Sequence, residues 1–446
     1  MKKKSVVIVG AGPGGLFAAY ELAKSGRHNI KVIDKGDDIE SRQRCDVLCG
    51  MGGAGLYSDG KIIYHHRVGT FLPLIVGVEK VNELNDYVES IFTGYDVHVK
   101  TLDSEEKKQL DDFRTKALQS GLNFVVTRTA HVGTDKLVDL IRSFRDSLID
   151  KGVEFITNEE VTKINKKTVV TKNNKRYGYD YLVLAPGRDG SEWLENIVRR
   201  DLSMEFGTDY IYNPVDVGVR VEVRREITDF ITNLSRDMKF YLNAGKGNRQ
   251  VRTFCTCPGG KVAIEDHGEY KTVNGHSEAG DPYENTNFAF LVTIPFTKPQ
   301  ANGNTFARYV ARTAYNLSGG SVLVQRFGDI LRGRRSKEET INEWLTQPSL
   351  KEAVPGSIPM NLPYEYMDTL IDGLQKLGKV VPGIDSEHTL FYSPEIKLHS
   401  LRLLTNEYLE TTRSNIYAAG DGPGLTRGIV AAAATGVLAA RGILKK

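Results

Sequence analysis

The sequence Gly-Ala-Gly-Pro-Gly-Gly at residues 10–15 constrains the fold of this chain more than any other feature. It follows an apolar run, residues 5–9, that is typical of a strand buried on both faces of a parallel sheet. Residues 17–25 carry apolar side chains at helical spacing, and a second apolar run ends in Asp34. A strand, a glycine-rich turn, a helix and a second strand predict a βαβ unit that binds a dinucleotide.

Each glycine of this turn has an expected role. Gly10 allows the tight turn, Gly12 lets the backbone approach a pyrophosphate, and Gly15 permits close packing of the helix on the strand. Gly14 lies at the helix start, where free N–H groups stabilise a diphosphate. Asp34 stands at the offset at which a carboxylate accepts hydrogen bonds from a ribose. The next residue, Lys35, is expected beside the same cofactor.

The length and texture of the chain predict two domains, because 446 residues exceed what a single core usually supports. After residue 200 the strands alternate and are separated by long polar loops. We therefore expect an α/β fold in which a doubly wound parallel-sheet domain, built from discontinuous segments, carries a mostly antiparallel α+β second domain. The expected bounds are 1–75, 121–200 and 385–446 for the first domain, 76–120 for a helical insertion, and 201–384 for the second domain.

Composition excludes several classes of protein. The 59 basic and 56 acidic residues give a net charge of only +3, so no nucleic-acid partner is expected. Four cysteines in a chain of this size do not form a secreted disulfide scaffold. The alanine-rich end is too short for a membrane span and carries Arg441. The lysine-rich start lacks a cleavage site, so we expect a cytoplasmic protein.

A second element lies near the end of the chain, where the sequence NIYAAGD is followed by GPGLTRG and an alanine-rich helix. It resembles the strand–Gly–Asp–helix signature of FAD-dependent oxidoreductases of the glutathione-reductase-like superfamily, which has two dinucleotide folds. The resemblance implies that Gly420 and Asp421 contact the ribityl or pyrophosphate part of FAD. It also implies that a helix start faces the N1/O2 edge of the flavin, where its dipole stabilises the reduced form. That helix start comprises Arg427, Gly428 and Ile429.

A third element, YLVLAPG at residues 181–187, resembles the apolar strand and Ala-Thr-Gly turn of the same superfamily, with Pro186 in place of threonine. The resemblance places Ala185 and Gly187 at the cofactor and implies that Val161 offers backbone groups to the adenine. No second GxGxxG motif follows a strand. A nicotinamide donor, NADH or NADPH, would therefore bind transiently, unless a protein partner supplies the electrons.

The sequence GMGGAGLYSDGK at residues 50–61 narrows the resemblance. It is similar to the GGAGxxSDGK loop of a family of FAD-dependent dehydrogenases, which also has a CxCPGG segment and an AGDGxGxxRGI end, both present here. The similarity covers nearly the whole chain. It implies flavin contacts from Gly53, Ala54 and Ser58, and we expect Arg42 to contact the FAD phosphates or ribose.

Two positions in this loop depart from the family pattern: Cys49 replaces an aromatic residue and Met51 replaces glutamate. These departures leave the substrate and the redox partner open. Lys61 ends the loop, and a cation near flavin N5 or N1 would raise the reduction potential. The alternative is that Lys61 only fixes a surface turn.

Four residues are candidates for catalysis: Lys61, Cys257, Glu395 and Lys397. Cys257 precedes a Pro-Gly-Gly turn and is expected to line the substrate site, with burial as a small apolar side chain as the alternative. Glu395 and Lys397 could serve as proton donor and substrate anchor, or form an internal ion pair on a strand. The CxxxC and CxC spacings differ from metal knuckles, and the histidines show no ligand spacing, so no metal site is predicted.

The leading hypothesis is an FAD-dependent oxidoreductase that transfers hydride between flavin N5 and a small or medium organic substrate. One alternative is a C=C reductase like the geranylgeranyl reductases, whose flavin loop resembles Cys49-Gly50 but whose aromatic–proline motif is not evident here. A flavin hydroxylase ranks last. A different class is a non-catalytic binding module like the GDP-dissociation inhibitors, which use this fold to hold prenyl chains.

Overall fold

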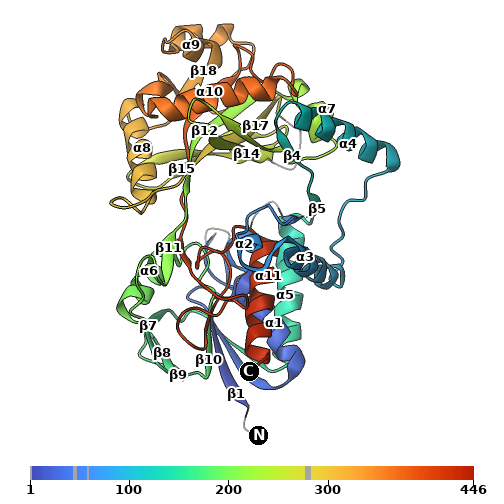
Figure 1. The fold of residues 1–446 in the computed structure, drawn as a ribbon, viewed down its shortest axis with the longest axis vertical. Helices are drawn as coiled ribbons and strands as arrows, with labels where there is room; N and C mark the ends of the chain where they lie inside the picture. Colours follow the sequence, from blue (N-terminus) through green and yellow to red (C-terminus); the bar gives the residue numbers. More distant parts are fainter. Residues whose placement is uncertain (1–2, 44–47, 58–59, 277–282) are drawn as a thin grey trace. The chain divides into compact units, whose positions relative to one another are not determined.

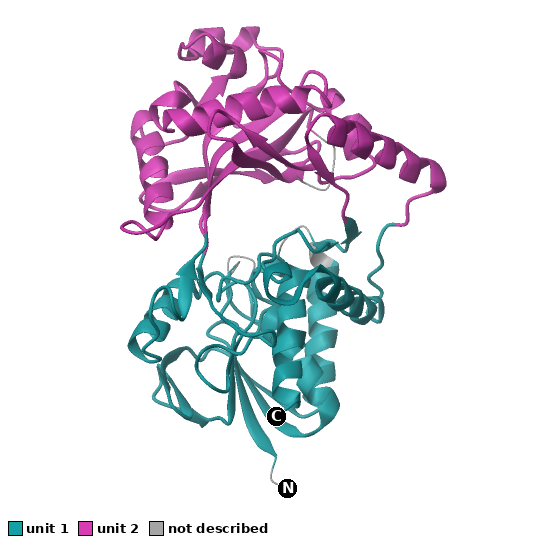
Figure 2. Ribbon diagram, in the orientation of Figure 1, with its two compact units in different colours: residues 1–100, 128–213, 400–446 teal, residues 101–127, 214–399 magenta. Residues whose placement is uncertain are grey.

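The computed structural model describes residues 3–43, 48–57, 60–276 and 283–446. The chain divides into two compact units, shown in teal and magenta in Figure 2. Unit 1 comprises residues 1–100, 128–213 and 400–446, and unit 2 comprises residues 101–127 and 214–399. Each unit encloses its own hydrophobic core.

Unit 1 is built on a five-stranded parallel sheet with the strand order β22-β10-β1-β2-β6 (Figure 1). Its strands are β1 (Lys4–Val9), β2 (His28–Ile33), β6 (Val153–Ile156), β10 (Tyr181–Leu184) and β22 (Ile416–Ala418). The helices of this unit are α1 (Pro13–Ser25), α2 (Pro73–Val76), α3 (Val78–Thr93), α5 (Thr134–Asp150), α6 (Ser191–Arg200) and α11 (Ile429–Leu444). The doubly wound parallel-sheet prediction is confirmed.

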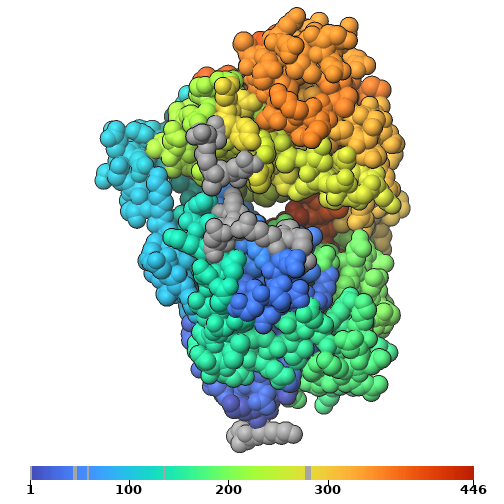
Figure 3. Space-filling view, turned by 180° about the vertical axis from the view of Figure 1, so that it is seen from behind, coloured from blue at the N-terminus to red at the C-terminus, as the bar shows by residue number. Residues whose placement is uncertain are grey.

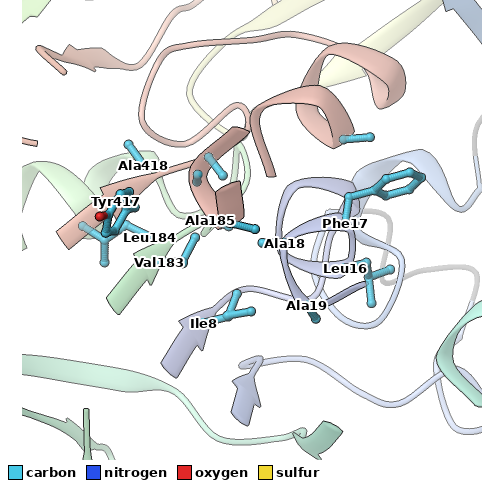
Figure 4. Packing of buried hydrophobic residues seen from close by; sticks show 14 of the residues in the cluster. Ile8, Leu16, Phe17, Ala18, Ala19, Val183, Leu184, Ala185, Tyr417 and Ala418 are labelled. Atoms are coloured by element: carbon cyan, nitrogen blue, oxygen red, sulfur yellow. The ribbon is translucent and has the colours of Figure 1, made fainter. Parts of the chain in front are cut away.

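The core of unit 1 lies between this sheet and its helices. The side chains of Ile8 and Val183 on the sheet and of Leu16 and Ala18 on α1 are buried together (Figure 4). Burial of continuous apolar strands on both faces is what a parallel sheet requires. Three smaller sheets complete the unit: β3 (Lys61–Tyr64) with β5 (Arg128–His131), β7 (Val161–Asn165) with β8 (Thr168–Thr171) and β9 (Arg176–Gly178), and β11 (Tyr210–Tyr212) with β21 (Leu401–Leu403).

Unit 2 is built on an eight-stranded sheet with the order β19-β18-β20-β12-β17-β14-β13-β4, in which only β18 and β19 pair in parallel. A hairpin, β15 (Lys261–Asp266) and β16 (Lys271–His276), accompanies it. The sheet strands are β4 (Asn123–Val125), β12 (Val215–Arg224), β13 (Lys239–Ala244), β14 (Arg249–Cys257), β17 (Asn285–Ile294), β18 (Leu323–Arg326), β19 (Val354–Pro355) and β20 (Leu390–Lys397). The mostly antiparallel second domain is thus confirmed.

The helices of unit 2 are α4 (Ser104–Gln119), α7 (Asp229–Thr232), α8 (Asn304–Leu317), α9 (Phe327–Leu331) and α10 (Tyr364–Gly378). A short 3-10 segment, Glu338–Glu343, also belongs to this unit. Helix α4 leaves most of its charged side chains in solvent, and it lies at the surface in the light-blue part of Figure 3. Its few buried residues, Leu110 and Ala117, join the core of unit 2.

The unit boundaries differ from the expected domain bounds in four places: residues 121–127 and 385–399 lie in unit 2, residues 201–213 lie in unit 1, and the segment 76–120 is divided. The segment 76–120, expected as one insertion, divides between the units, because α3 buries its apolar side chains in the core of unit 1 whereas α4 does so in unit 2. Strand β20, expected within 385–446 of the first domain, is a central strand of the unit 2 sheet. These segments belong to the unit in which their tertiary partners bury them, and the sequence alone does not specify those partners.

Strand β12 is central to this sheet and is two-faced. Its valines, from Val215 to Val223 at every second position, enter the core beneath α8 and α10. The intervening positions carry polar or small residues, Asp216, Gly218, Arg220 and Glu222, and these point to the opposite face because side chains alternate along a strand. We call this opposite face the polar sheet face.

Candidate functional site

The glycine-rich turn of unit 1 packs directly on the end of β10. Gly10 has a φ of +108°, and a Cβ there would lie 2.0 Å from the carbonyl oxygen of Ala185. A Cβ on Gly15 would lie 1.9 Å from the carbonyl oxygen of Gly10. Only glycine fits at either place. The turn therefore has the close helix–strand packing that the sequence predicted for a dinucleotide site.

The start of α1 packs against the middle of α11, and the N-termini of both helices border the 3-10 segment Gly53–Gly55. Helix α1 packs along α11, where a Cβ on Gly436 would lie 2.1 Å from the carbonyl oxygen of Gly14. A Cβ on Gly14 would in turn lie 3.3 Å from the backbone nitrogen of Gly420. Neither helix has a side-chain capping bond from its N-cap residue, Gly12 in α1 and Gly428 in α11. Uncapped N–H groups and the helix dipole favour an anion at both ends.

The carboxylate of Asp34 is buried and is bonded to the backbone. One oxygen accepts a hydrogen bond from Ala11 N at 2.7 Å, and the other accepts from Gly36 N at 2.9 Å and Gly50 N at 3.1 Å. Burial raises the pKa of Asp34, while these amide bonds act in the opposite direction. Asp34 thus ties the glycine turn to the loop that begins at Gly50. The neighbouring Lys35 forms an ion pair with Asp189.

Arg42 is also buried and holds the same loop. Its guanidinium donates to the carbonyl oxygens of Met51 at 2.6 Å and Gly50 at 3.3 Å, and it lies 5.2 Å from the ring centroid of Tyr57. The loop in turn contacts the glycine turn, since a Cβ on Gly53 would lie 3.0 Å from the Cα of Gly12. The expected flavin loop and the expected diphosphate turn are therefore adjacent.

Three other predicted site residues lie in this loop or directly after it. Ala54 lies in the 3-10 segment Gly53–Gly55, and a Cβ on Gly55 would lie 3.1 Å from Ile429 at the start of α11. Ser58 lies outside the described residues. Lys61 begins β3 and is half-buried. Burial raises the pKa of Cys49, which makes this thiol a weaker nucleophile at neutral pH.

Asp421 is fixed by two partners. Its carboxylate accepts hydrogen bonds from Thr426 Oγ1 at 2.7 Å and from Arg188 Nε at 3.1 Å. The position of Arg188 directly after Gly187 was the only signal for this pair, and the sequence alone did not single out either donor. Gly420 donates its N–H to Thr435 of α11 at 2.8 Å.

The remaining cofactor predictions also lie in unit 1. A Cβ on Gly422 would come within 3.1 Å of Gly187 N, so the turns after β10 and β22 are in contact. Arg427 donates its backbone N–H to Gly69 O at 2.7 Å. Val161 is buried at the start of β7, and its carbonyl oxygen accepts from Trp193 Nε1 at 2.5 Å. That carbonyl is therefore already engaged by a side chain.

In unit 2 the polar sheet face brings three predicted catalytic residues together with one that sequence reasoning missed. Glu395 lies fully buried between Arg220, whose Nη1 is 3.1 Å from Oε2, and Lys397, whose Nζ is 3.0 Å from Oε1. Arg220, also fully buried, donates to Asn287 Oδ1 at 2.6 Å and lies 3.5 Å from Cys257 Sγ. The signal for Arg220 was present in VDVGVRVEV, where charges interrupt valines at alternate positions.

The pKa of Arg220 depends both on its burial and on the neighbouring carboxylate. Burial alone would lower the pKa of Arg220, but the Glu395 carboxylate raises it above its ordinary value. The guanidinium therefore stays charged. Glu395 lies between two cationic side chains, Arg220 and Lys397, and is fully buried.

The CxC segment is shaped by a bulge. The register between β14 and β17 shifts between Phe254 and Cys257, and Cys255 has a φ of +49°. A bulge of this kind re-aims the following side chain. A Cβ on Gly275 would lie 2.6 Å from Cys257 Sγ and 1.8 Å from Arg220 Nη2, so β16 covers the thiol closely. Cys257 is only 4% exposed.

A second buried cluster lies further along the polar sheet face. Asp216 accepts hydrogen bonds from Thr293 Oγ1 at 2.7 Å and bonds His399 Nε2 at 3.0 Å, and it pairs with Arg252. Burial alone would raise the pKa of Asp216, but Arg252 and His399 together hold it well below its usual value. This cluster was not predicted.

Within the described ranges, no group of three or more histidine, cysteine and carboxylate side chains could hold a metal ion. Cys45, the first thiol of the CxxxC spacing, lies outside those ranges. Among the described helices none combines the length and the apolar character needed to cross a membrane.

Two protein families match parts of this chain. Residues 8–55 match the model of an NAD(P)-binding Rossmann-like domain, and residues 214–397 match the model "FAD-dependent protein, C-terminal domain-like". An uncharacterized protein of Clostridium beijerinckii is 27% identical over 485 residues, covering 100% of this chain and 81% of that protein. An uncharacterized protein of Methanosarcina barkeri is 27% identical over 281 residues, covering 62% of this chain and 54% of that protein.

Solved structures are more distant. Glycine oxidase from Geobacillus kaustophilus has a TM-score of 0.40 and 12% identity, with 100% of this chain and 96% of that chain covered. A likeness at this TM-score does not support a functional assignment. The two family models and the glycine-rich turn at the start of α1 support the assignment of FAD as the cofactor and of the chain as an FAD-dependent oxidoreductase.

Proposed function

We propose that this protein transfers hydride between N5 of FAD and a small or medium organic substrate. The carrying observation is a turn where only glycine fits, at the start of α1, together with the segment Gly53–Gly55, which contacts this turn and the start of α11. Anions are stabilised at such ends. Bound FAD supplies the hydride chemistry at its N5 atom.

The residues of unit 1 bind and orient the cofactor in this proposal. The backbone N–H groups of Gly12, Gly14 and Gly15 would hold the diphosphate, and the start of α11 would stabilise negative charge on the reduced ring. Asp421 would contact the ribityl or pyrophosphate part of FAD, and Arg188 and Thr426 hold its two carboxylate oxygens. Asp34 acts through the backbone, because its hydrogen bonds position the glycine turn against the loop at Gly50.

The residues of unit 2 have different parts in the proposal. Lys397 anchors the substrate, and its side chain keeps 14% of its surface exposed. Glu395 and Arg220 are positioning residues: they are fully buried, and Glu395 fixes the Lys397 ammonium at 3.0 Å. Cys257 lines the same cluster, but β16 covers its thiol, so we assign it a positioning part beside Arg220.

The experiment is an anaerobic screen of flavin reduction. The holoenzyme is mixed with NADH, NADPH and a panel of alcohols, amines and hydroxy acids, and loss of the visible band of oxidised flavin is followed. For any compound that bleaches the flavin, the Lys397→Met variant should react at least about tenfold more slowly, a loss of ~1.4 kcal/mol in transition-state stabilisation. FAD content and reduction by dithionite should not change.

The matched control is Lys376→Met, which removes an ammonium paired with Asp372 on the opposite side of the sheet, in α10. It should reduce at the wild-type rate. Equal rates in Lys397→Met and wild type would contradict the assignment of the substrate anchor.

A further inference from the structure

Arg402 occupies an unusual place in the small sheet of β11 and β21. Its neighbours Leu401 and Leu403 are buried in the core of unit 1, at 3% and 1% exposure. Since side chains alternate along a strand, Arg402 points to the opposite face, where it is half-buried. Its guanidinium carbon lies 4.7 Å from the ring centroid of Phe71, a separation typical of a cation stacked on an aromatic ring.

This placement puts Arg402 against the loop that runs from Asp421 to the start of α11. A Cβ on Gly424 of that loop would lie 2.8 Å from the Cα of Arg402. Phe71, whose ring stacks on the guanidinium, is bonded to the same loop, because its backbone N–H donates to Leu425 O at 2.9 Å. Both the guanidinium and the ring beneath it are therefore held at the loop that leads to the second helix N-terminus.

No described residue neutralises this charge. Other arginines of unit 1 pair with carboxylates: Arg441 with Glu21, and Arg413 with Asp209. The guanidinium of Arg402 makes neither an ion pair nor a hydrogen bond with any side chain or backbone group of the described ranges. Burial lowers its pKa, and no carboxylate opposes that effect. A partly desolvated cation without a counter-ion is costly, which points to an anion supplied by a ligand.

We propose that Arg402 is an anion-binding residue of the redox site, which contacts either the negative charge of the reduced flavin ring or a carboxylate of the substrate. The proposal rests on the proposed function, because the loop beside Arg402 is the one assigned to FAD. A planar guanidinium suits both sources, since each spreads its charge over two atoms that can accept parallel hydrogen bonds.

The test uses the purified full-length holoenzyme and three variants. Arg402→Gln removes the charge, and Arg402→Lys keeps the charge but removes the planar fork. Arg176→Gln, at an exposed arginine of β9 in the same unit, is the matched control. Two quantities are measured in each protein: the midpoint potential of the flavin, and the affinity of the oxidised enzyme for benzoate and for its uncharged analogue benzamide, by calorimetry.

Each source of the anion gives its own pattern. If Arg402 contacts the reduced flavin, Arg402→Gln should weaken binding of the reduced form about tenfold, which is ~30 mV lower potential for a two-electron couple. Arg402→Lys should then keep most of the potential. If Arg402 binds a substrate carboxylate, benzoate affinity should fall about tenfold in both variants, while benzamide binding and the potential stay unchanged.

The proposal is overturned if Arg402→Gln retains its FAD and neither quantity moves beyond the Arg176→Gln control. Failure of the proposed function is a separate result. A wild-type protein that binds no FAD would contradict that function, and benzoate calorimetry on the same protein would still decide Arg402: binding lost in Arg402→Gln supports a carboxylate site, and unchanged or absent binding overturns it. The Arg402→Lys variant provides a folded comparison if glutamine destabilises the sheet.

Discussion

Removing one partner of the buried ion pair between Arg220 and Glu395 should destabilise unit 2, because the other partner is left as a buried charge. Arg220→Met removes a guanidinium that is 0% exposed and leaves the Glu395 carboxylate, also 0% exposed, with Lys397 as its remaining cation. It also removes hydrogen bonds to Asn287 Oδ1 and the carbonyl oxygen of Cys255. Breaking a buried pair in this way costs about 3–5 kcal/mol of unfolding free energy.

Replacing both partners should be much less costly. In Arg220→Met/Glu395→Leu both members of the fully buried pair are removed, and such replacements are often neutral or stabilising. The double variant should therefore be more stable than Arg220→Met alone. Lys397 would lose its anion, but its side chain can extend toward water because 14% of it is already exposed.

The assay is urea unfolding followed by tryptophan fluorescence. The chain has two tryptophans, and Trp193→Phe leaves Trp344 in unit 2 as the reporter. The four proteins of the double-mutant cycle are compared in that background. An Arg220→Met cost below about 1 kcal/mol, the value for an exposed pair, would refute the reasoning. So would a double variant less stable than both single variants.

Three further predictions concern other sites. Gly15→Ala should abolish FAD binding and lower the melting temperature, because its Cβ would lie 1.9 Å from Gly10 O; FAD content and calorimetry check this, and a full FAD complement would contradict it. Asp216 has a folded-state pKa below its ordinary 3.8, so it stabilises unit 2 above that pH and the contribution is lost as pH falls below it. Asp216→Asn should flatten this acid-side loss in urea midpoints measured against pH, and an unchanged slope would refute the assignment. Cys257→Ser should slow substrate-dependent flavin reduction, whereas Cys255→Ser should mainly affect stability; equal, stability-only effects would leave Cys257 as a packing residue.

Local sequence patterns were enough to predict the parallel-sheet unit. The glycines at 10–15 lie within one strand–turn–helix segment. A side chain on Gly15 would clash with backbone close by in the sequence, the carbonyl oxygen of Gly10. The alternation in β12 likewise predicted a strand with two different faces. These features depend on neighbours in sequence, so they could be predicted from the chain alone.

Long-range partners could not be predicted in the same way. Arg220 and Glu395 are separated by 175 positions, and only the pairing of β12 with β20 brings them together. The pairing of Arg188 with Asp421 depends on the contact between the turns after β10 and β22. The three backbone amides that donate to Asp34 also take their positions from the folded loop, so these hydrogen bonds could not be predicted from the chain alone.

The most direct test of the central claim, that the glycine-rich turn of unit 1 holds FAD, is identification of the bound nucleotide. The purified chain is denatured, and the released compound is separated by chromatography and quantified against protein. The account predicts FAD at about one molecule per chain, as expected for a single GxGxxG site. A colourless protein that releases no flavin and takes up none on reconstitution would contradict it.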